Sequence, residues 1–178
     1  SSFVLAGLGA YLLVNYLIKN KTGAFVAGIV YAFSPIHFAY SMGFGGATHI
    51  EWIPFYILFL LKFFHQPSVK KLLATGLFFA LVMVNEPHFA AYTLLFTLLI
   101  FAYHAIKKPE LIKNKKFVKY SALAAIVLLS FLIWKYLPLM KIASSESNWL
   151  NPGLEQATNY STDVLGIITP SYLHPLWG

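Results

Sequence analysis

The chain of 178 residues is 58% hydrophobic and only 11% charged, and its mean hydropathy is +0.67. This composition is more apolar than that of a soluble domain of similar size, so it indicates an integral membrane protein. The formal net charge is +7, but the sequence has no basic stripe with interleaved aromatic residues, which favours membrane lipids over nucleic acid as the partner. The absence of cysteine excludes disulfides and thiolate chemistry.

Charged residues alternate along the chain between lysine-bearing and acid-bearing segments. The lysine-bearing segments contain Lys19, Lys21, Lys62, Lys70, Lys71, Lys107, Lys108, Lys113, Lys115, Lys116 and Lys119. The acid-bearing segments contain His49, Glu51, Glu86, His88, Glu146, Glu155 and Asp163. Because lysine is retained on the inner face of a membrane, the lysine-bearing segments are predicted to be cytoplasmic. The acids and four of the six histidines are then extracytoplasmic, and chemistry is expected there.

Six apolar runs are predicted to be membrane-spanning helices, so the expected fold class is all-α transmembrane. The runs cover residues 3–18, 23–40, 47–64, 72–84, 88–106 and 117–140. Pro35, near the outer end of the second run, is predicted to kink it. Residues 141–178 are rich in Ser, Asn, Pro and Gly and are predicted to form an irregular or short-helical extracytoplasmic segment. The chain begins inside an apolar run without a signal peptide, so we interpret it as a fragment of a longer protein.

Residues 72–106 are predicted to form two short spans instead of one. A single helix of this length would measure over about 50 Å, which exceeds the bilayer core of about 30 Å. It would also place Lys70 and Lys71 on the opposite side from the lysines that follow residue 106. A turn at residues 85–88, with the sequence NEPH, returns all lysine clusters to one side.

Two His–Glu pairs lie at predicted outer helix ends, His49 with Glu51 and Glu86 with His88. In a functional interpretation the carboxylates are catalytic bases or metal ligands, and the histidines bind substrate, ligate the metal or carry a proton. In a structural interpretation both acids cap helices. The spacing T-x-x-E at residues 48–51 is that of a capping box, and an acid directly before a proline is typical of a helix start. The sequence leaves both interpretations open.

Other polar residues are candidates to complete the site. Asp163 and His174 belong to the predicted outer segment and could join the two pairs. Lys135 and Lys141, at the outer end of the last run, suit the phosphate of a lipid-linked substrate, although lysines there also snorkel towards lipid headgroups. His37 is interpreted as a hydrogen-bonded packing residue and not as a ligand.

Three stretches carry a resemblance to a known family: residues 32–37 (AFSPIH), residues 51–54 (EWIP) and residues 163–176 (DVLGIITPSYLHPL). They resemble polytopic membrane proteins of archaea and bacteria that bear the domain name "6-pyruvoyl-tetrahydropterin synthase-related". That name describes no pterin chemistry, and these proteins look like members of the wider GT-C glycosyltransferase superfamily.

The resemblance implies transfer of a sugar from a lipid-phosphate donor on the extracytoplasmic face, with an acidic residue as general base or as ligand of a divalent metal ion. It also implies that the principal catalytic acid lies upstream of residue 1, which leaves Glu51 and Glu86 as acids of the site lining. Two alternatives stay open: a carrier or flippase for a lipid or sugar, and a non-catalytic membrane scaffold subunit. Carriers usually have ionisable groups near the membrane midplane and two repeated halves. Here the acids lie at predicted helix ends and the sequence has no internal repeat, which favours the enzyme over the carrier.

Overall fold

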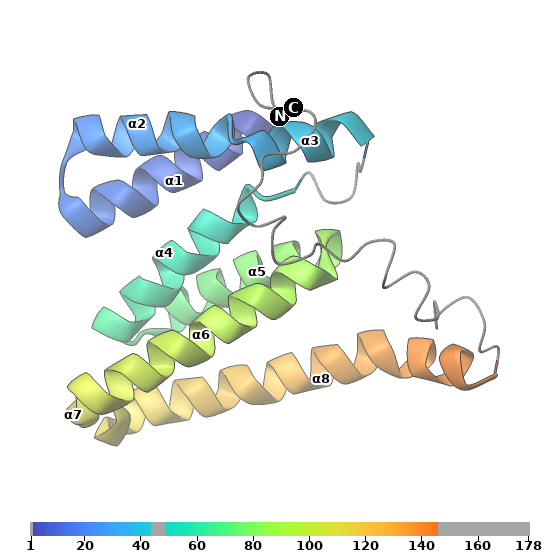
Figure 1. Ribbon diagram of the computed structural model, residues 1–178. Coiled ribbons are helices and arrows are strands. Elements are labelled where there is room, and N and C mark those ends of the chain that lie inside the picture. The colour runs from blue at the N-terminus through green and yellow to red at the C-terminus, as the bar shows by residue number, and fades with distance from the viewer. Residues whose placement is uncertain (1, 44–48, 146–178) are drawn as a thin grey trace, which may run out of the picture. The chain divides into compact units, whose positions relative to one another are not determined.

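The computed structural model describes residues 2–43 and 49–145, and every regular element within these ranges is an α-helix (Figure 1). The helices are α1 (Ser2–Ile18), α2 (Lys21–Ala32), α3 (Pro35–Gly43), α4 (Trp52–His65), α5 (Val69–Asn85), α6 (Pro87–Lys107), α7 (Pro109–Lys113) and α8 (Lys115–Ser145). The predicted helical class is confirmed. The chain divides into two compact units, residues 1–127 and residues 128–178, and each is described by itself.

Within the described ranges, three helical segments are long and apolar enough to cross a membrane. They are Lys21–Ala39, Pro87–Lys107 and Lys115–Pro138, and they coincide with the second, fifth and sixth predicted runs. Ser2–Ile18 and Trp52–His65 are apolar but shorter. Helix length and composition alone therefore support three candidate spans, where the sequence pattern predicts six.

The second predicted run, residues 23–40, is a helix interrupted in its C-terminal half. α2 ends at Ala32, and Phe33 caps it with a backbone N–H that donates to Ile29. Ser34 is not helical and α3 begins at Pro35. A residue before proline avoids the α-helical region, and proline suits the first helical position. The kink predicted at Pro35 is confirmed as a short break between two helices.

The predicted hairpin at residues 85–88 is also confirmed. α5 ends at Asn85, Glu86 alone connects the helices with an extended backbone (φ −147°, ψ 102°), and α6 begins at Pro87. The Glu86 N–H still donates to the carbonyl of Val82, so it closes the last turn of α5. One residue therefore both ends α5 and begins α6, which makes this a tight turn between two helices.

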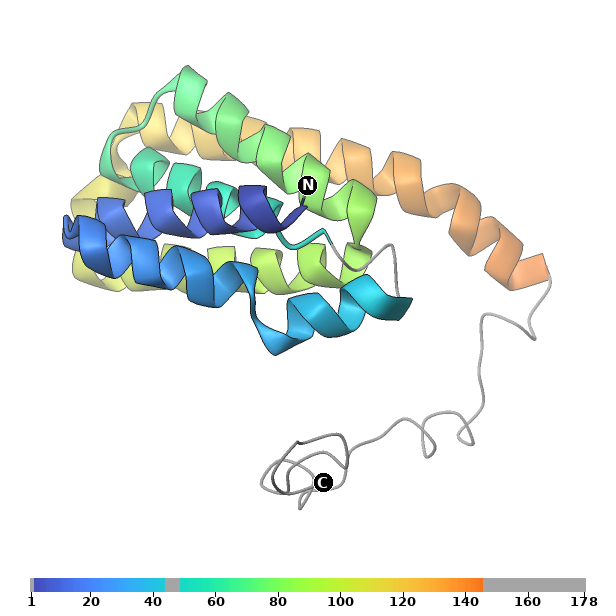
Figure 2. The same cartoon turned by 90° about the horizontal axis from the view of Figure 1, so that it is seen from above.

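Small residues allow close packing between α1 and α2, which lie side by side (Figure 2). A Cβ added at Gly28 would meet the backbone oxygen of Gly7 at 2.8 Å, and one added at Gly7 would meet the oxygen of Gly28 at 3.3 Å. The backbones thus approach each other where neither residue has a side chain. Small residues at interfaces are a common means of packing helices in membranes.

A largely aromatic core lies among α4, α5, α6 and the start of α8. Its buried members are Tyr56, Leu60, Phe63, Phe64 and Phe117. The Phe117 ring lies 5.5 Å from that of Phe63 and 5.3 Å from that of Phe64, measured between ring centroids. These contacts fix the start of α8 beside the end of α4.

Contacts at both of their ends show that α1 and α4 run in the same direction. At their starts the Ser2 hydroxyl donates to Glu51, with 2.6 Å between Oγ and Oε2. At their ends the Tyr16 hydroxyl lies 2.5 Å from Nδ1 of His65. We call the first the polar end and the second the lysine end of residues 2–127. The hairpin turn at Glu86 lies at the polar end, because α5 starts directly after α4 and runs back beside it.

The predicted alternation of charge corresponds to these two ends. The lysines at the termini of α1, α2, α4, α5, α6 and α7 lie at the lysine end. One acid departs from the predicted pattern, because Glu110 in α7 also lies at the lysine end. The separation of charge between the ends is therefore real in the fold, although it is not complete.

The last predicted span, residues 117–140, is part of the longer helix α8, which runs through Pro138 to Ser145. Lys135 and Lys141 lie on the part of α8 that belongs to the second unit. The predicted outer segment begins in the last turns of α8, and residues 146–178 lie outside the described part of the chain, as do Asp163 and His174.

Candidate functional site

Glu51 is the most deeply buried acid among the described residues. It directly precedes α4, is 3% exposed, and has a helical backbone with φ −61° and ψ −28°. Its side chain makes no capping hydrogen bond to α4. Glu51 therefore does not cap α4 through its carboxylate, whereas Thr48, the other residue of the predicted capping box, lies outside the described residues.

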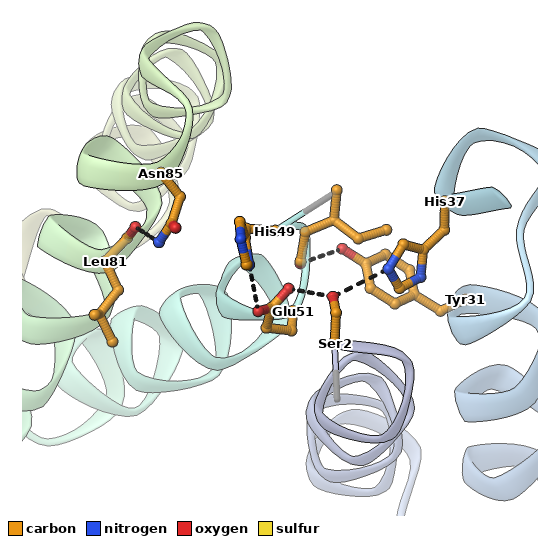
Figure 3. Close-up of polar contacts among 8 residues, drawn as sticks. Ser2, Tyr31, His37, His49, Glu51, Leu81 and Asn85 are labelled. Carbon is orange, nitrogen blue, oxygen red and sulfur yellow. Dashed lines mark hydrogen bonds and ion pairs between the residues drawn. The ribbon is translucent and has the colours of Figure 1, made fainter. Parts of the chain in front are cut away.

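Both carboxylate oxygens of Glu51 are engaged by other side chains (Figure 3). Oε1 lies 3.0 Å from Nδ1 of His49, and Oε2 accepts a hydrogen bond of 2.6 Å from the Ser2 hydroxyl. His49 is partly accessible, with 40% of its side chain exposed against 4% for Glu51. A covered carboxylate thus contacts one nitrogen of an imidazole whose side chain is partly exposed.

His37 extends the same network towards α3. It is fully buried, with Nδ1 2.8 Å from the carbonyl oxygen of Ala32 and Nε2 3.1 Å from Oγ of Ser2. Phe3 stacks on the imidazole at 4.0 Å between ring centroids. His37 is therefore hydrogen-bonded and packed, as predicted, but it also contacts the residue that bonds Glu51. We call Ser2, His37, His49 and Glu51 the polar network.

Two residues of this region are missed by the sequence reasoning. Ser2 bridges His37 and Glu51, and the Tyr31 hydroxyl donates a 2.9 Å hydrogen bond to the carbonyl of Ile50, which anchors the segment that carries His49 and Glu51. A serine at the start of an apolar run has no motif around it, and its partners are 35 and 49 residues away in sequence. Only the packing of α1 beside α3 and the start of α4 brings them together.

The surroundings of Glu51 set its ionisation. Burial raises the pKa of this carboxyl, but hydrogen bonds from Ser2, from His49 and from the backbone of Glu51 itself lower it by more. The net effect is a pKa below the ordinary value for glutamate, so Glu51 is ionised at neutral pH. An ionised carboxylate accepts hydrogen bonds only, and His49 must therefore present N–H at Nδ1.

The second predicted pair, Glu86 and His88, also comes together but in a different setting. Oε1 of Glu86 lies 2.6 Å from Nδ1 of His88 and 3.3 Å from its backbone nitrogen, which caps α6. The His88 side chain is 85% exposed. Asn85 donates to the carbonyl of Leu81, 2.7 Å away (Figure 3). For Glu86 the capping interpretation is therefore confirmed, while a catalytic role stays a prediction.

The other predicted site residues lie in the second unit or outside the described residues. Nζ of Lys135 lies 5.9 Å from the ring centroid of Tyr136, a contact within the second unit. Lys141 follows on the same helix. Asp163 and His174 fall outside residues 2–43 and 49–145. The roles of these four residues stay predictions.

A metal centre does not fit the described residues. Within residues 2–43 and 49–145, no three His, Cys, Asp or Glu side chains are placed to hold a metal ion. The oxygens of Glu51 are instead occupied by protein donors. The chemistry available at the polar network is hydrogen bonding and proton transfer.

Compared with known protein families, curated proteins and solved structures, the chain matches none.

Proposed function

We propose that the chain is the transmembrane core of a GT-C-like glycosyltransferase, in which His49 is a general base and Glu51 orients it. The observation that carries the proposal is the pairing of a buried, ionised carboxylate with Nδ1 of an imidazole that is 40% exposed. With N–H at Nδ1, the lone pair of Nε2 is available to a substrate. Proteins prepare histidine for proton transfer by this kind of carboxylate contact.

In the proposed reaction an acceptor hydroxyl attacks the anomeric carbon of a sugar linked to a lipid phosphate. Nε2 of His49 takes the hydroxyl proton while the new carbon–oxygen bond forms. The bond from the anomeric carbon to the phosphate oxygen breaks, and its electron pair leaves on the lipid phosphate. Glu51 stabilises the imidazolium that results. This differs from the sequence prediction, because Glu51 is covered at 3% exposure and His49 is the group a substrate can reach.

The proposal places six spans in the membrane, formed by α1, α2 with α3, α4, α5, α6 and α8, with the lysine end cytoplasmic. Large apolar side chains on these helices support this placement, for example Val4 (69% exposed), Val30 (65%) and Leu73 (66%). Exposing this much apolar surface is unfavourable in water and favourable in lipid. The short helices α1 and α4 pack against each other and against longer neighbours.

The remaining predicted roles belong to the same proposal. Lys135 and Lys141 contact the donor phosphate, and Asp163 and His174 contact the substrate from the outer segment. Glu86 and His88 line the acceptor side of the site. Each of these roles follows from sequence reasoning alone.

Donor cleavage in lipid nanodiscs tests the proposal. The protein is supplied with polyprenyl-phosphate glucose or mannose and an alkyl glucoside acceptor, and release of polyprenyl phosphate is measured. His49→Gln is expected to lower turnover by about 10²- to 10⁴-fold, the usual contribution of a general base. His65→Gln is the matched control, because it removes a histidine at the opposite, lysine end of α4. Equal turnover by the unaltered protein and His49→Gln would remove His49 from the reaction.

A further inference from the structure

Both ring nitrogens of buried His37 have oxygen neighbours. The carbonyl of Ala32, 2.8 Å from Nδ1, can only accept, so Nδ1 carries a hydrogen. Nε2 lies 3.1 Å from the hydroxyl oxygen of Ser2. The protonation of Nε2 is therefore decided by where Ser2 directs its hydroxyl hydrogen.

The Ser2 hydroxyl has a single hydrogen, and it donates to Oε2 of Glu51 at 2.6 Å. Its oxygen then presents only lone pairs to Nε2 of His37. The contact is a hydrogen bond only if Nε2 donates, because two lone pairs facing each other repel. His37 then carries hydrogen on both nitrogens and is positively charged. If Ser2 donates its hydrogen to an ionised Glu51, His37 must therefore be positively charged.

Burial requires that any charge on Glu51 or His37 be offset by a nearby charge. His37 is 0% exposed and Glu51 is 3% exposed. A single charge at such a site is costly, whereas two opposite charges joined by hydrogen bonds offset each other. Among residues 2–43 and 49–145, the other titratable groups that face them are Tyr31 from α2, whose hydroxyl donates to Ile50, and His49 before α4. Neither supplies a buried positive charge, since His49 is partly exposed.

We propose that His37 is a buried imidazolium that acts through the Ser2 hydroxyl as the counter-charge of Glu51, and so holds His49 in its Nδ1–H form. Ser2 and His37 are positioning residues for the site of the proposed function. The inference rests on that site, but it concerns the state of the protein before any substrate binds. It assigns a role to a histidine for which the sequence suggests only packing.

A competing neutral arrangement contains the same atoms. In it Glu51 is protonated and donates to Ser2, and Ser2 donates to an unprotonated Nε2 of His37. One proton has moved from Nε2 to the serine oxygen, while the serine proton has moved to Oε2. The two arrangements therefore differ in a measurable way, by one hydrogen on Nε2 of His37.

Imidazole ¹⁵N chemical shifts of histidine-labelled protein in nanodiscs, recorded near neutral pH, test the proposal. In the unaltered protein both nitrogens of His37 are expected to be protonated. Ser2→Thr keeps the hydroxyl and should keep this pattern. Ser2→Ala and Glu51→Gln should each remove the Nε2 hydrogen. His88, paired with Glu86 on another loop, is the internal control and should keep its shifts in all variants.

An unprotonated Nε2 on His37 in the unaltered protein overturns the proposal, and this result requires no variant to fold. An imidazolium that persists in both Ser2→Ala and Glu51→Gln also overturns it. The proposed function fails separately: normal shifts with no loss of turnover in His49→Gln would refute the transferase mechanism and leave the charged pair intact.

Discussion

At the scale of single residues, the two acids that look alike in sequence differ in the fold. Both lie two residues from a histidine, and both contact its Nδ1 through Oε1. Glu86 caps α6 at the rim with a partner that is 85% exposed, whereas Glu51 is covered and bonds no helix amide of α4. Local sequence predicts the cap. It cannot predict the contact with Ser2, because that depends on packing between distant helices.

The variants Glu51→Gln and Glu86→Gln should differ in how much stability the protein loses. Glu51→Gln places an amide where two donors, Ser2 and His49, point at two acceptors, and leaves at least one buried group unsatisfied. We expect a loss of about 1–3 kcal/mol. Glu86→Gln keeps a carbonyl oxygen for the cap and should cost less than about 0.5 kcal/mol. Thermal unfolding in detergent measures both, and equal losses would contradict the structural difference.

The ionised state of Glu51 also predicts a pH dependence. Because its folded pKa is lowered, the unfolded chain binds a proton more readily, with an ordinary glutamate pKa of about 4.3. The contribution to stability is complete above that value and is lost as pH falls through the folded pKa. Lowering the pH should therefore reduce the Tm of the unaltered protein more than that of Glu51→Gln. Parallel curves for the two proteins would show that Glu51 is not the titrating group.

At the scale of elements, the apolar runs predict where helices lie but not how closely they approach. The turn at Glu86 follows from the lysines that must return to one side, and the break before α3 follows from Pro35. The contact between α1 and α2 depends instead on Gly7 facing Gly28. In the sequence each glycine indicates only a weak helix former. The contact between the two glycines depends on how the helices pack and is seen only in the structure.

Two glycine-to-alanine changes should therefore have opposite signs. At Gly28 the new Cβ would lie 2.8 Å from the backbone oxygen of Gly7, so the helices must separate, at a cost of about 1–3 kcal/mol. At Gly76, inside α5, a Cβ meets nothing within 4 Å. Alanine there should stabilise by about 0.5–1 kcal/mol through helix propensity. Unfolding temperatures in one detergent decide the matter, and destabilisation of similar size at both positions would argue against the close approach.

At the scale of the whole molecule, charge and hydropathy predict much of the topology of residues 2–127. The lysine-bearing segments meet at one end because each helical pair returns the chain to it, and Glu110 is the acid that departs from the pattern. Span number is less well predicted, because α1, α4 and α5 are shorter than an isolated span requires. Hydropathy is calculated along one helix at a time. Whether a short helix can lie in the membrane depends on its packing beside longer helices.

Sidedness is the property on which the proposed site depends, and it can be tested directly because the chain contains no cysteine. Lys70→Cys reports the lysine end, and His88→Cys reports the polar end, where the side chain is 85% exposed. A membrane-impermeant maleimide added to intact cells should label only His88→Cys, and Lys70→Cys should react only after permeabilisation.

Labelling of both cysteines from one side would mean that α5, which separates them, does not cross the membrane. Labelling of Lys70→Cys alone in intact cells would turn the polar network towards the cytoplasm. His49 could then meet only donors and acceptors of that compartment, so the lipid-phosphate donor of the outer leaflet would no longer be its substrate. The hydrogen bonds among Ser2, His37 and Glu51 would be unchanged, because they depend on the packing of α1, α3 and α4 and not on the orientation of the bundle.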